Sequence, residues 1–579
     1  MTRRSRGWLG ALALSLLAGI AVSWQRWASP VIDSGREMNQ PLRLAGGEML
    51  YSDVGHIYGP LSPYLHAALY RLFGPSLAVL YGDGIVSTVL ILLLVYLLAR
   101  RIMDDAAAGI ATLSVTWLCA LKPAGNYIFP YSYNALHGTL FGLMTLAIVE
   151  PAIAVPSAAR FAVAGVAAGV TLLAKTEMGL AALAAGVAAA WLAPGGRRQA
   201  VRRALVFGAC GAAVAGGVYA VIAARVGWRT LAFDSWLLPL RLPEPLAHFN
   251  AAISGFDHPL LSLGRMLRAA AKLALLGALI ASVSAIAAGS PALKRRGWWL
   301  LAGAVAAGVL LATTGGLDWE SGPFLAMPLL LVALLLVLAR RPLSGRDRVV
   351  VLYALFALVQ LARMLLHVRS GGAYGSFLVP VSVVLFIYVW VEPFAAALAE
   401  PAVRRAASSL VLTILLIGAI GTAVVLGYRY RRADTVRVTT ARGTLIAPAD
   451  VGAVWNQALA FIDARTRPGD PIAVFPEGTS LTFLSGRRNP LREEIVTPGF
   501  LDAAGEARAI AALQRSDTRL VLLVNRPTRE FGAEAFGRDY CRTLMQWLAR
   551  RYQPCATFGA RDPRLQIGDA PFFVRAYCR

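Results

Sequence analysis

Long apolar segments separated by short polar loops run through the first 428 residues of this 579-residue chain. A helix needs about 20 consecutive apolar residues to cross a bilayer. Charged residues make up only 15% of the chain, against roughly 25% in a soluble domain. We therefore predict a polytopic α-helical membrane protein with about thirteen spans. The predicted spans are residues 8–24, 77–99, 106–124, 134–150, 161–174, 178–193, 204–226, 265–288, 298–315, 323–339, 349–367, 375–396 and 407–428.

The basic residues indicate how these spans are oriented. The formal net charge is +24, and the arginines gather in short loops that the span pattern puts on one side of the membrane. Because such loops face the cytoplasm, we expect a bacterial inner (plasma) membrane protein with a cytoplasmic N-terminus and an extracytoplasmic C-terminus. The same distribution argues against a nucleic-acid partner. Residues 8–24 are alternatively a signal peptide cleaved after Ala21-Val22-Ser23, but Trp24 and Trp27 favour a membrane anchor.

Residues 429–579 lose the apolar pattern and have an ordinary globular composition. Apolar runs at 471–476 and 519–525 predict buried strands. Alternating strands and helices are typical of an α/β domain with a partly parallel sheet. We therefore expect a transmembrane domain, residues 1–428, followed by an extracytoplasmic α/β domain, residues 429–579. Helical periodicity in the second domain covers residues 453–467, 503–515 and 534–551.

Three cysteines lie near the C-terminus, and their predicted compartment permits oxidation. Outside the cytoplasm disulfides form and persist, so we expect two of Cys541, Cys555 and Cys578 to pair. The spacing leaves all three pairings open.

The loop between the first two predicted spans is the most polar stretch of the transmembrane domain. Acids gathered at one face of a membrane protein indicate a functional site. Asp33 and Glu37 are four residues apart, so they share a face on a helical turn, where one could act as a base and the other as a ligand of Mg²⁺ or Mn²⁺. The alternative is a solvated loop with Asp33 as a helix N-cap. The other polar residues of this loop include Glu48, Tyr51, Asp53, His56 and Tyr58.

Further polar candidates interrupt apolar segments near the same predicted face. Lys175 and Glu177 break the apolar run 161–193 into two spans. At this hinge Lys175 either grips a phosphate or forms an internal pair with Glu177. Arg369 follows the eleventh span and either holds a lipid phosphate or snorkels to the interface. Asp83 lies between two glycines in the second span, where it is either part of a site or a polar contact between helices.

Five segments of the transmembrane domain, taken together, resemble the sequence pattern of a known family. They are Asp33 soon after the first span, Gly47-Glu48-Met49-Leu50-Tyr51-Ser52-Asp53, Gly59-Pro60-Leu61 leading into Tyr64–Gly74, Gly165–Lys175, and Tyr374–Pro380. This set resembles the C-type (GT-C) glycosyltransferases, in particular the bacterial protein O-mannosyltransferase and aminoarabinose-transferase-like (family 39-like) group. The resemblance covers about residues 1–400.

The resemblance implies a membrane enzyme that transfers a sugar, with inversion, from a polyprenyl-phosphate-linked donor. The acceptor is a glycan, lipid or protein on the extracytoplasmic face, and membrane lipid surrounds the enzyme. Asp33 corresponds to the family's catalytic acid, and Glu37 is the second catalytic candidate. Relatives often carry an adjacent Asp-Glu pair, whereas three residues separate Asp33 from Glu37 here. The candidate substrate-binding residues are Asp53, His56, Tyr58, Lys175, Glu177, Arg369 and Tyr374.

The chemistry of such a transfer needs a base for the acceptor hydroxyl and positive charge at the leaving phosphate. Asp33 can supply the first, and Lys175 or Arg369 the second. The main alternative function is a membrane transporter or a lipid-linked sugar flippase, although transporters usually place ionisable groups near the bilayer midplane. A third is a scaffold whose outer domain binds a glycan or a partner.

The second domain carries a candidate binding segment, residues 474–490, which follows a predicted strand. Open α/β sheets place their ligand crevice at such strand ends. Glu477, Arg487 and Arg488 would then recognise the acceptor or cover the catalytic loop; alternatively they are surface charges of a tight turn. We expect this domain to shape acceptor choice and to carry no catalytic group.

Overall fold

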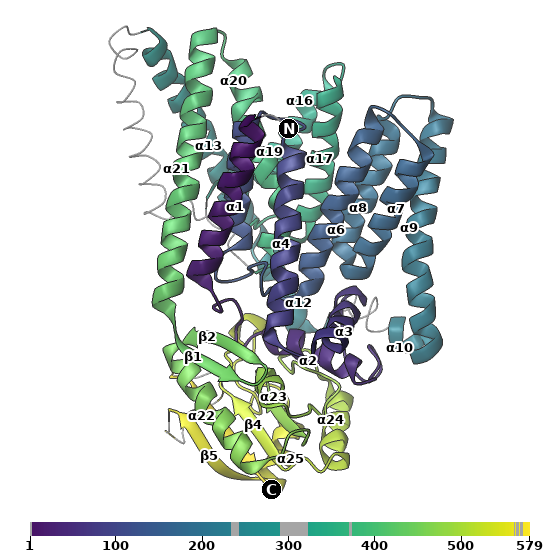
Figure 1. Cartoon of the computed structure of the whole chain (residues 1–579), viewed down its shortest axis with the longest axis vertical. Coiled ribbons are helices and arrows are strands. Elements are labelled where there is room, and N and C mark those ends of the chain that lie inside the picture. Colours follow the sequence, from purple (N-terminus) through teal and green to yellow (C-terminus); the bar gives the residue numbers. More distant parts are fainter. Residues whose placement is uncertain are drawn as a thin grey trace.

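The computed structural model describes residues 3–232, 242–289, 322–369, 373–560, 562, 565, 567 and 571–579. A bundle of long helices occupies one end of the molecule and a small α/β domain the other (Figure 1). The helices of the bundle and its loops are α1 (Arg3–Ser23), α2 (Ser34–Ala45), α3 (Leu61–Phe73), α4 (Leu77–Ala99), α5 (Asp105–Val115), η1 (Thr116–Ala120), α6 (Tyr133–Val149), η2 (Glu150–Ile153), α7 (Ala158–Ala174), α8 (Thr176–Leu192), α9 (Arg197–Val226), α10 (Trp228–Ala232), α12 (Glu244–Ser254), α13 (Pro259–Gly289), η4 (Pro323–Ala326), α16 (Met327–Ala339), α17 (Gly345–Leu361), η5 (Ala362–Met364), α18 (Gly375–Leu378), α19 (Pro380–Val391), α20 (Pro393–Ala397) and α21 (Pro401–Ala433).

The predicted spans coincide with helices wherever the structure describes them. The match at α4, residues 77–99, is complete, whereas the predicted span 298–315 lies outside the described residues. Among the residues that the structure describes, seven helices are long and apolar enough to cross a membrane, and four shorter apolar helices accompany them. A polytopic helical fold is therefore confirmed within the described ranges, and the number of thirteen spans stays a prediction.

Small residues allow the bundle helices to approach closely. Gly165 and Gly169 of α7 face α9, where a Cβ on Gly165 would lie 2.2 Å from the carbonyl oxygen of Phe207. Such small residues are typical of helix contacts in membranes, where the backbones come together. The glycines that the sequence places before Lys175 therefore fix the packing of α7, and through it the position of the hinge that follows.

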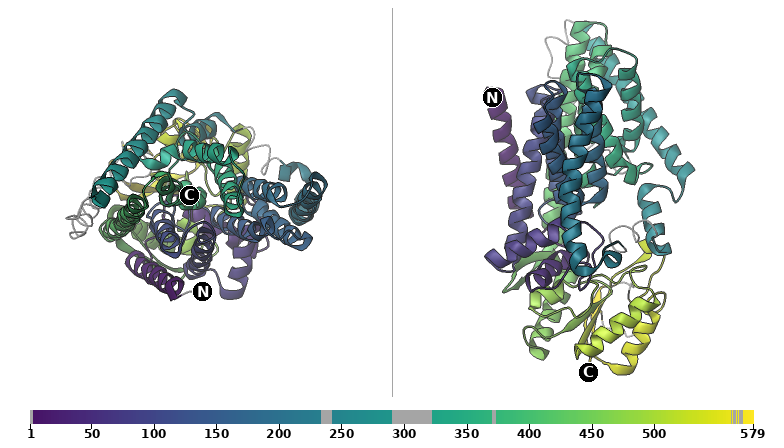
Figure 2. Two further views of the ribbon diagram at one scale, coloured as in Figure 1. Left: turned by 90° about the horizontal axis from the view of Figure 1, so that it is seen from above. Right: turned by 90° about the vertical axis from the view of Figure 1, so that its right-hand side faces the viewer.

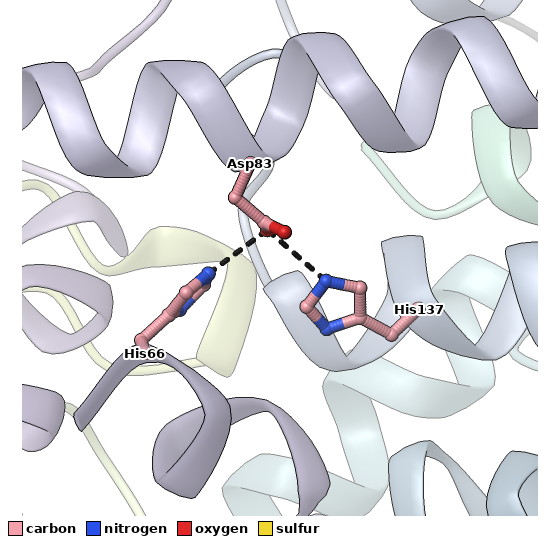
Figure 3. Close-up of side chains that lie close together, drawn as sticks. All are labelled: His66, Asp83 and His137. Atoms are coloured by element: carbon pink, nitrogen blue, oxygen red, sulfur yellow. Dashed lines mark hydrogen bonds and ion pairs between the residues drawn. The ribbon is translucent and has the colours of Figure 1, made fainter. Parts of the chain in front are cut away.

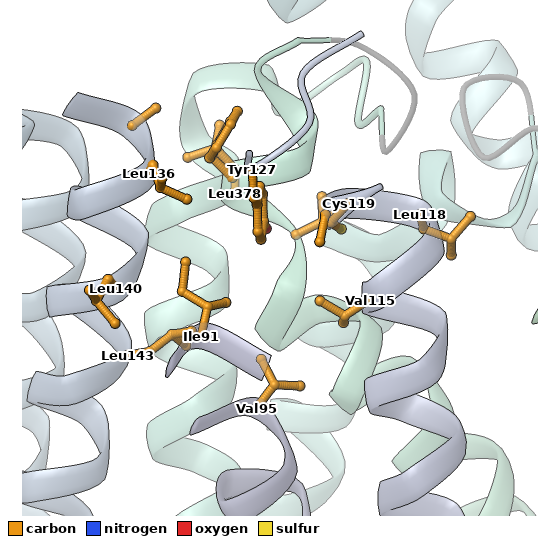
Figure 4. Close-up of a cluster of buried hydrophobic side chains, with 14 of the residues drawn as sticks. Ile91, Val95, Val115, Leu118, Cys119, Tyr127, Leu136, Leu140, Leu143 and Leu378 are labelled. Atoms are coloured by element: carbon orange, nitrogen blue, oxygen red, sulfur yellow. The ribbon is translucent and has the colours of Figure 1, made fainter. Parts of the chain in front are cut away.

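Large apolar side chains fill the centre of the bundle (Figure 4). Ile91 and Val95 of α4 are buried there with Leu140 and Leu143 of α6. Cys119, on the turn after α5, is fully buried in the same cluster. This packing fixes α4, α5 and α6 relative to one another.

Basic residues gather at the end of the bundle that is remote from the α/β domain. The chain begins at that end (Figure 1). Helix α4 starts beside the α/β domain, where the Leu77 N–H donates to the Arg442 carbonyl at 2.8 Å, and it ends at Arg100, which pairs with Asp105. Arg346 donates to the Ile102 carbonyl at the same end. This arrangement agrees with a cytoplasmic N-terminal face, which stays a prediction.

The α/β domain consists of a hairpin and a four-stranded sheet with helices around it. The sheet order is β3-β4-β6-β5, in which β3 and β4 are parallel and the other pairs antiparallel. The predicted strands and the helix at 503–515 are observed, but the helix expected at 534–551 begins only at Arg542. The elements are β1 (Asp434–Thr440), β2 (Gly443–Pro448), α22 (Ala449–Arg465), β3 (Ile472–Phe475), α23 (Ser480–Ser485), α24 (Ala503–Arg515), β4 (Leu520–Val524), η6 (Arg529–Phe531), α25 (Arg542–Arg551), β5 (Gln553–Gly559) and β6 (Phe573–Cys578).

Covalent and backbone contacts hold this domain together and dock it on the bundle. A disulfide joins Cys555 of β5 to Cys578 of β6, which resolves the predicted pairing. Cys541 is a buried free thiol. The hairpin packs under the bundle, where the Ile446 N–H donates to the Gln25 carbonyl at 2.7 Å. The right-hand view of Figure 2 shows the two parts in contact and places the C-terminus at the end opposite the N-terminus.

Candidate active site

Asp33 lies at the N-terminus of α2, between the bundle and the α/β domain. Its φ angle of 59° is in the left-handed region, which non-glycine residues seldom adopt. Oδ1 lies 3.3 Å from Nη2 of Arg36. Burial raises the pKa of the Asp33 carboxyl to about 7; Arg36 opposes this shift, and Glu477 and Glu37 add to it. A carboxyl with this pKa is suited to act as a general base near neutral pH.

Glu37 is buried one turn further along α2, and both of its oxygens are engaged. Oε1 accepts from Nε of Arg36 at 3.0 Å, and Oε2 accepts from the Tyr133 N–H at 2.9 Å. Arg36 also donates to the Tyr131 carbonyl at 2.8 Å. Glu37 thereby fixes Arg36 and ties α2 to the start of α6.

These contacts bear on the expected Mg²⁺ or Mn²⁺ ion at Asp33 and Glu37. Hard divalent cations need several oxygen ligands with free lone pairs. Here the guanidinium of Arg36 lies beside both carboxylates, and the second oxygen of Glu37 already has a backbone partner. The donor set therefore does not fit a cation, and Arg36 supplies the positive charge. The cofactor stays a prediction that this geometry does not favour.

Lys175 occupies the hinge between α7 and α8 and is buried among aromatic rings. Nζ donates to Oη of Tyr131 at 2.6 Å and lies 3.5 Å from Oε1 of Glu177. It is 4.7 Å from the ring centroid of Tyr58 and 5.9 Å from that of Tyr374. Cations so close to ring faces are stabilised by the ring quadrupole. Of the two alternatives for this hinge, the internal Lys175–Glu177 pair is observed, within a larger cluster, and a phosphate contact of Lys175 stays a prediction.

Arg363 of η5 completes this cluster and was not predicted from the sequence. It forms an ion pair with Glu177, and its guanidinium carbon lies 4.6 Å from the ring centroid of Tyr374. The predicted arginine, Arg369, hydrogen-bonds instead to His367 in its own loop, at 2.9 and 3.1 Å. The sequence did contain an indication of this role: Arg363 is a basic residue inside the predicted span 349–367, and charges in apolar segments usually mark functional sites.

His56 and Asp53 have different positions within the first loop. The buried ring of His56 is 2.9 Å from Oε1 of Gln40 and 3.2 Å from the Gly59 carbonyl. Burial, aided by Arg36, lowers the pKa of His56 to about 3, so a neutral ring holds the loop in place. The Asp53 carboxylate is exposed and accepts from the Met49 N–H at 2.8 Å, a contact that closes a local turn.

The α/β domain reaches Asp33 through one side chain. Oε1 of Glu477 accepts from the Asp33 N–H at 2.6 Å, and its Oε2 accepts from Nε of Arg526 at 2.9 Å. Glu477 therefore contacts the loop that carries Asp33, and recognition of an acceptor by this segment stays a prediction. Arg487 is turned into its own domain, where it pairs with Asp463 at 2.6 Å.

A cavity of about 160 Å³ lies between the first loop and the α/β domain. Arg36, His56 and Tyr58 line it on the side of the bundle. Charged residues of both signs line it on the other side, namely Arg492, Glu493, Glu494, Asp502 and Arg508. Arg36, which lies 3.3 Å from Asp33, is one of its lining residues, so the cavity comes close to Asp33.

A larger, mainly apolar groove of about 660 Å³ opens on the other side of the same loop. Gly59 packs so closely on the end of α7 that a Cβ would lie 2.0 Å from the Leu173 carbonyl oxygen. Since Pro60 and Leu173 both line the groove, it begins within two residues of Tyr58 and of Lys175 along the chain. The other lining residues are Met49, Leu61, Tyr64, Leu65, Gly217, Val218, Val221, Ile222 and Arg225.

The fold is similar to that of a solved membrane-protein structure. The crystal structure of ArnT from Cupriavidus metallidurans bound to undecaprenyl phosphate matches with a TM-score of 0.52, over 98% of this chain and 98% of that chain, at 13% identity. The archaeal oligosaccharyltransferase AglB from Archaeoglobus fulgidus, in complex with an inhibitory peptide and a dolichol-phosphate, matches with a TM-score of 0.47 over 89% of this chain and 69% of that chain, at 14% identity. No protein-family model and no curated protein sequence matches the chain.

Proposed function

We propose that this protein is an integral-membrane glycosyltransferase of the bacterial inner membrane. It moves a sugar from a polyprenyl-phosphate-linked donor to a glycan, lipid or protein hydroxyl on the extracytoplasmic face. The observation that carries the proposal is the position of Tyr58 close to both charged groups of the site. The guanidinium carbon of Arg36, which pairs with Asp33 and Glu37, lies 5.7 Å from the ring centroid of Tyr58, and Nζ of Lys175 lies 4.7 Å from it, while an apolar groove begins two residues further along the chain at Pro60. The fold shared with ArnT, which was crystallised with undecaprenyl phosphate, supports the choice of lipid.

The two sides of the site carry opposite net charge. On the α2 side, once Asp33 is ionised above its pKa of about 7, the carboxylates of Asp33 and Glu37 outweigh the single cation of Arg36 by one negative charge. On the hinge side, Lys175 and Arg363 outweigh Glu177 by one positive charge. A displacement at an anomeric carbon requires this polarity, because a base acts on the acceptor while charge develops on the leaving phosphate.

The donor fits the hinge side. Its prenyl chain lies in the apolar groove, where burial of each CH₂ contributes about 0.8 kcal/mol. The phosphate then lies near Lys175 and Arg363. The donor is a phosphodiester with one negative charge, and cleavage releases a monoester that carries a second. The net positive charge of this side therefore stabilises the leaving group more than the donor, which lowers the barrier.

The acceptor approaches from the side of Asp33. Asp33 takes the proton of the acceptor hydroxyl, the hydroxyl oxygen forms a bond to the anomeric carbon, and the bond from that carbon to the phosphate oxygen breaks. The electron pair stays with the polyprenyl phosphate. Attack opposite the leaving group inverts the anomeric configuration. The cavity lined by Arg36, Tyr58 and charged residues of the α/β domain is the proposed entry for the acceptor.

The test uses the purified full-length protein in liposomes with a polyprenyl-phosphate sugar labelled in the sugar. Release of polyprenyl phosphate and transfer of label to an envelope extract are measured. We expect Asp33→Asn to lower both rates by about 10²–10⁴-fold, the range for loss of a general base. Asp53→Asn, an exposed acid of the same loop, is the matched control and should stay near the parent rate. Parent-like rates in Asp33→Asn, or movement of intact lipid-linked sugar across the bilayer without cleavage, would contradict the proposal.

A further inference from the structure

Three side chains that the proposed reaction does not use converge at the end of the bundle nearest the α/β domain. His66 comes from α3, Asp83 from α4 and His137 from α6 (Figure 3). Nε2 of His66 lies 2.9 Å from Oδ2 of Asp83, and Nε2 of His137 lies 3.0 Å from the same oxygen. The three ligand atoms are all within 4.8 Å of one another.

The geometry points to a site for a divalent transition-metal ion, which we propose to be Zn²⁺. Two imidazoles and one carboxylate form a donor set typical of zinc sites with one open position. Ligand atoms bound 2.0–2.1 Å from a tetrahedral ion lie about 3.3 Å apart. The observed separations of 2.9 and 3.0 Å are therefore a few tenths of an ångström short. Small rotations of the three side chains open enough space for the ion.

The surroundings of the cluster orient its rings as metal ligands are usually oriented. Oγ of Ser62 lies 2.8 Å from Nδ1 of His137, the position where a second partner fixes the ring of a metal-bound histidine. The Tyr133 ring meets the His66 ring edge to face, with centroids 4.3 Å apart. Both histidines are buried, whereas Asp83 is partly exposed. The exposed side is the entry for the ion and the place of its open position.

Hydrogen bonding alone explains the cluster less completely. In that case two N–H groups share one carboxylate oxygen, and an acid stays in an apolar helix, which is costly in a membrane protein. A bound cation compensates this charge. Proton balance is also satisfied: Asp83 is the anionic ligand, and each ring binds the ion through Nε2 while its proton moves to Nδ1, which for His137 then donates to Ser62.

The ion would act by position. Tyr133 packs on His66 and gives its N–H to Glu37, so the metal site and α2 meet at the start of α6. Zinc binding therefore fixes the relative positions of α3, α4 and α6. Through the Tyr133 N–H this also fixes the position of Glu37, and through Glu37 that of Arg36. This inference concerns metal binding, and it stands or fails independently of glycosyl transfer.

The test measures zinc in the untagged, purified full-length protein after treatment with a chelator, loading with ZnCl₂ and desalting. We expect about one zinc ion per chain in the parent protein, as a three-ligand site binds one ion. Asp83→Asn and His137→Gln should each lose most of it. His367→Gln, a histidine outside the cluster, is the matched control and should keep the ion. Glu37→Gln should keep it as well, which separates this site from the carboxylates of α2.

A second measurement covers variants that fold poorly. Zinc should raise the melting temperature of the parent protein and of His367→Gln, and X-ray absorption of the zinc-loaded parent should report imidazole nitrogen ligands. Equal zinc content in the parent and in both cluster variants, or a parent protein that retains no zinc, would overturn the proposal. So would an absorption spectrum without imidazole ligands.

Discussion

The backbone N–H of Asp33 donates a hydrogen bond to Oε1 of Glu477 at 2.6 Å, although 444 positions separate the two residues in the sequence. Glu477 is in turn held by Arg526 at 2.9 Å. The positive φ of Asp33 needs support from its surroundings, because such a conformation costs of order 1–3 kcal/mol. The α/β domain provides that support. It therefore positions the proposed base, a role that the expectation of an acceptor-selecting domain does not include.

The pKa of Asp33 predicts how the reaction depends on pH. Burial raises this pKa to about 7, and only the ionised form can accept a proton. We therefore expect kcat/KM to rise about tenfold per pH unit below pH 7, and to fall again above about pH 8, because burial lowers the pKa of Lys175 to about 8 and its charge at the leaving phosphate is then lost. The measurement is the initial rate of polyprenyl phosphate release from pH 5 to 9 at low donor concentration. If kcat/KM instead reached its plateau with an apparent pKa near 4, the ordinary value for an aspartate, Asp33 would not be the base in this environment.

Glu477→Gln tests the contact between the two domains. Glu477 raises the pKa of Asp33 by its negative charge, so its neutralisation should move the acidic limb to lower pH. The amide oxygen of glutamine can still accept from the Asp33 N–H, which keeps the loop in place. Glu530→Gln is the matched control, because Glu530 also pairs with Arg526, at 2.6 Å. An unchanged limb in Glu477→Gln would show that this charge does not reach Asp33.

Lys175→Ala and Arg363→Ala should weaken the use of the donor. Each removes one cation from the hinge side and leaves Glu177 partly uncompensated. We expect the KM for the lipid-linked donor to rise about tenfold or more, equivalent to at least about 1.4 kcal/mol of binding. A fall in kcat should accompany it, because the leaving phosphate loses stabilisation. Arg369→Ala, whose arginine contacts His367, is the control. If Lys175→Ala and Arg363→Ala kept the donor KM and kcat of the parent, as the control should, the cluster would have a structural role only.

The sequence predicts which residues share this face, and the structure explains how they meet. Asp33, Lys175 and Tyr374 come from separate external segments of the predicted topology. They converge because α2, the α7–α8 hinge and the loop before α18 lie at the same end of the bundle. Hydrophobic periodicity is sufficient for this conclusion, since it fixes which end of each helix faces which side.

The remaining site residues depend on tertiary contacts that periodicity does not contain. Arg363 lies at the end of an apolar run, and only the fold turns it toward Glu177 rather than toward solvent. Strands β5 and β6 escaped prediction because they carry few consecutive apolar residues. The face that the α/β domain presents to α2 depends on tertiary contacts such as the hydrogen bond that the Asn39 amide donates to the Thr479 backbone carbonyl, at 2.6 Å. No local pattern specifies such a contact.

The last prediction concerns Arg43, which fastens the first loop to the α/β domain. Its Nη1 lies 2.9 Å from Oε1 of Glu494, and its Nη2 lies 2.6 Å from Oε2 of Glu48. Both Arg43 and Glu494 are buried. Arg43→Met leaves the Glu494 charge buried without its cation, and breaking such a pair costs about 3–5 kcal/mol. The melting temperature in detergent should fall clearly, whereas Arg71→Met, at an exposed arginine of α3 that contacts backbone carbonyls, should change it little.

Two further measurements identify the cause of that loss as electrostatic. The double variant Arg43→Met with Glu494→Met should recover much of the stability, since replacing both members of a buried pair is often neutral. The defect of the single variant should also shrink as pH falls. Burial already raises the pKa of Glu494, and Arg43 opposes this shift. Without Arg43 the carboxyl therefore takes up a proton at higher pH, and the neutral acid is tolerated in the interior. A defect that is equal at pH 5 and pH 8, with no recovery in the double variant, would indicate lost packing as the cause.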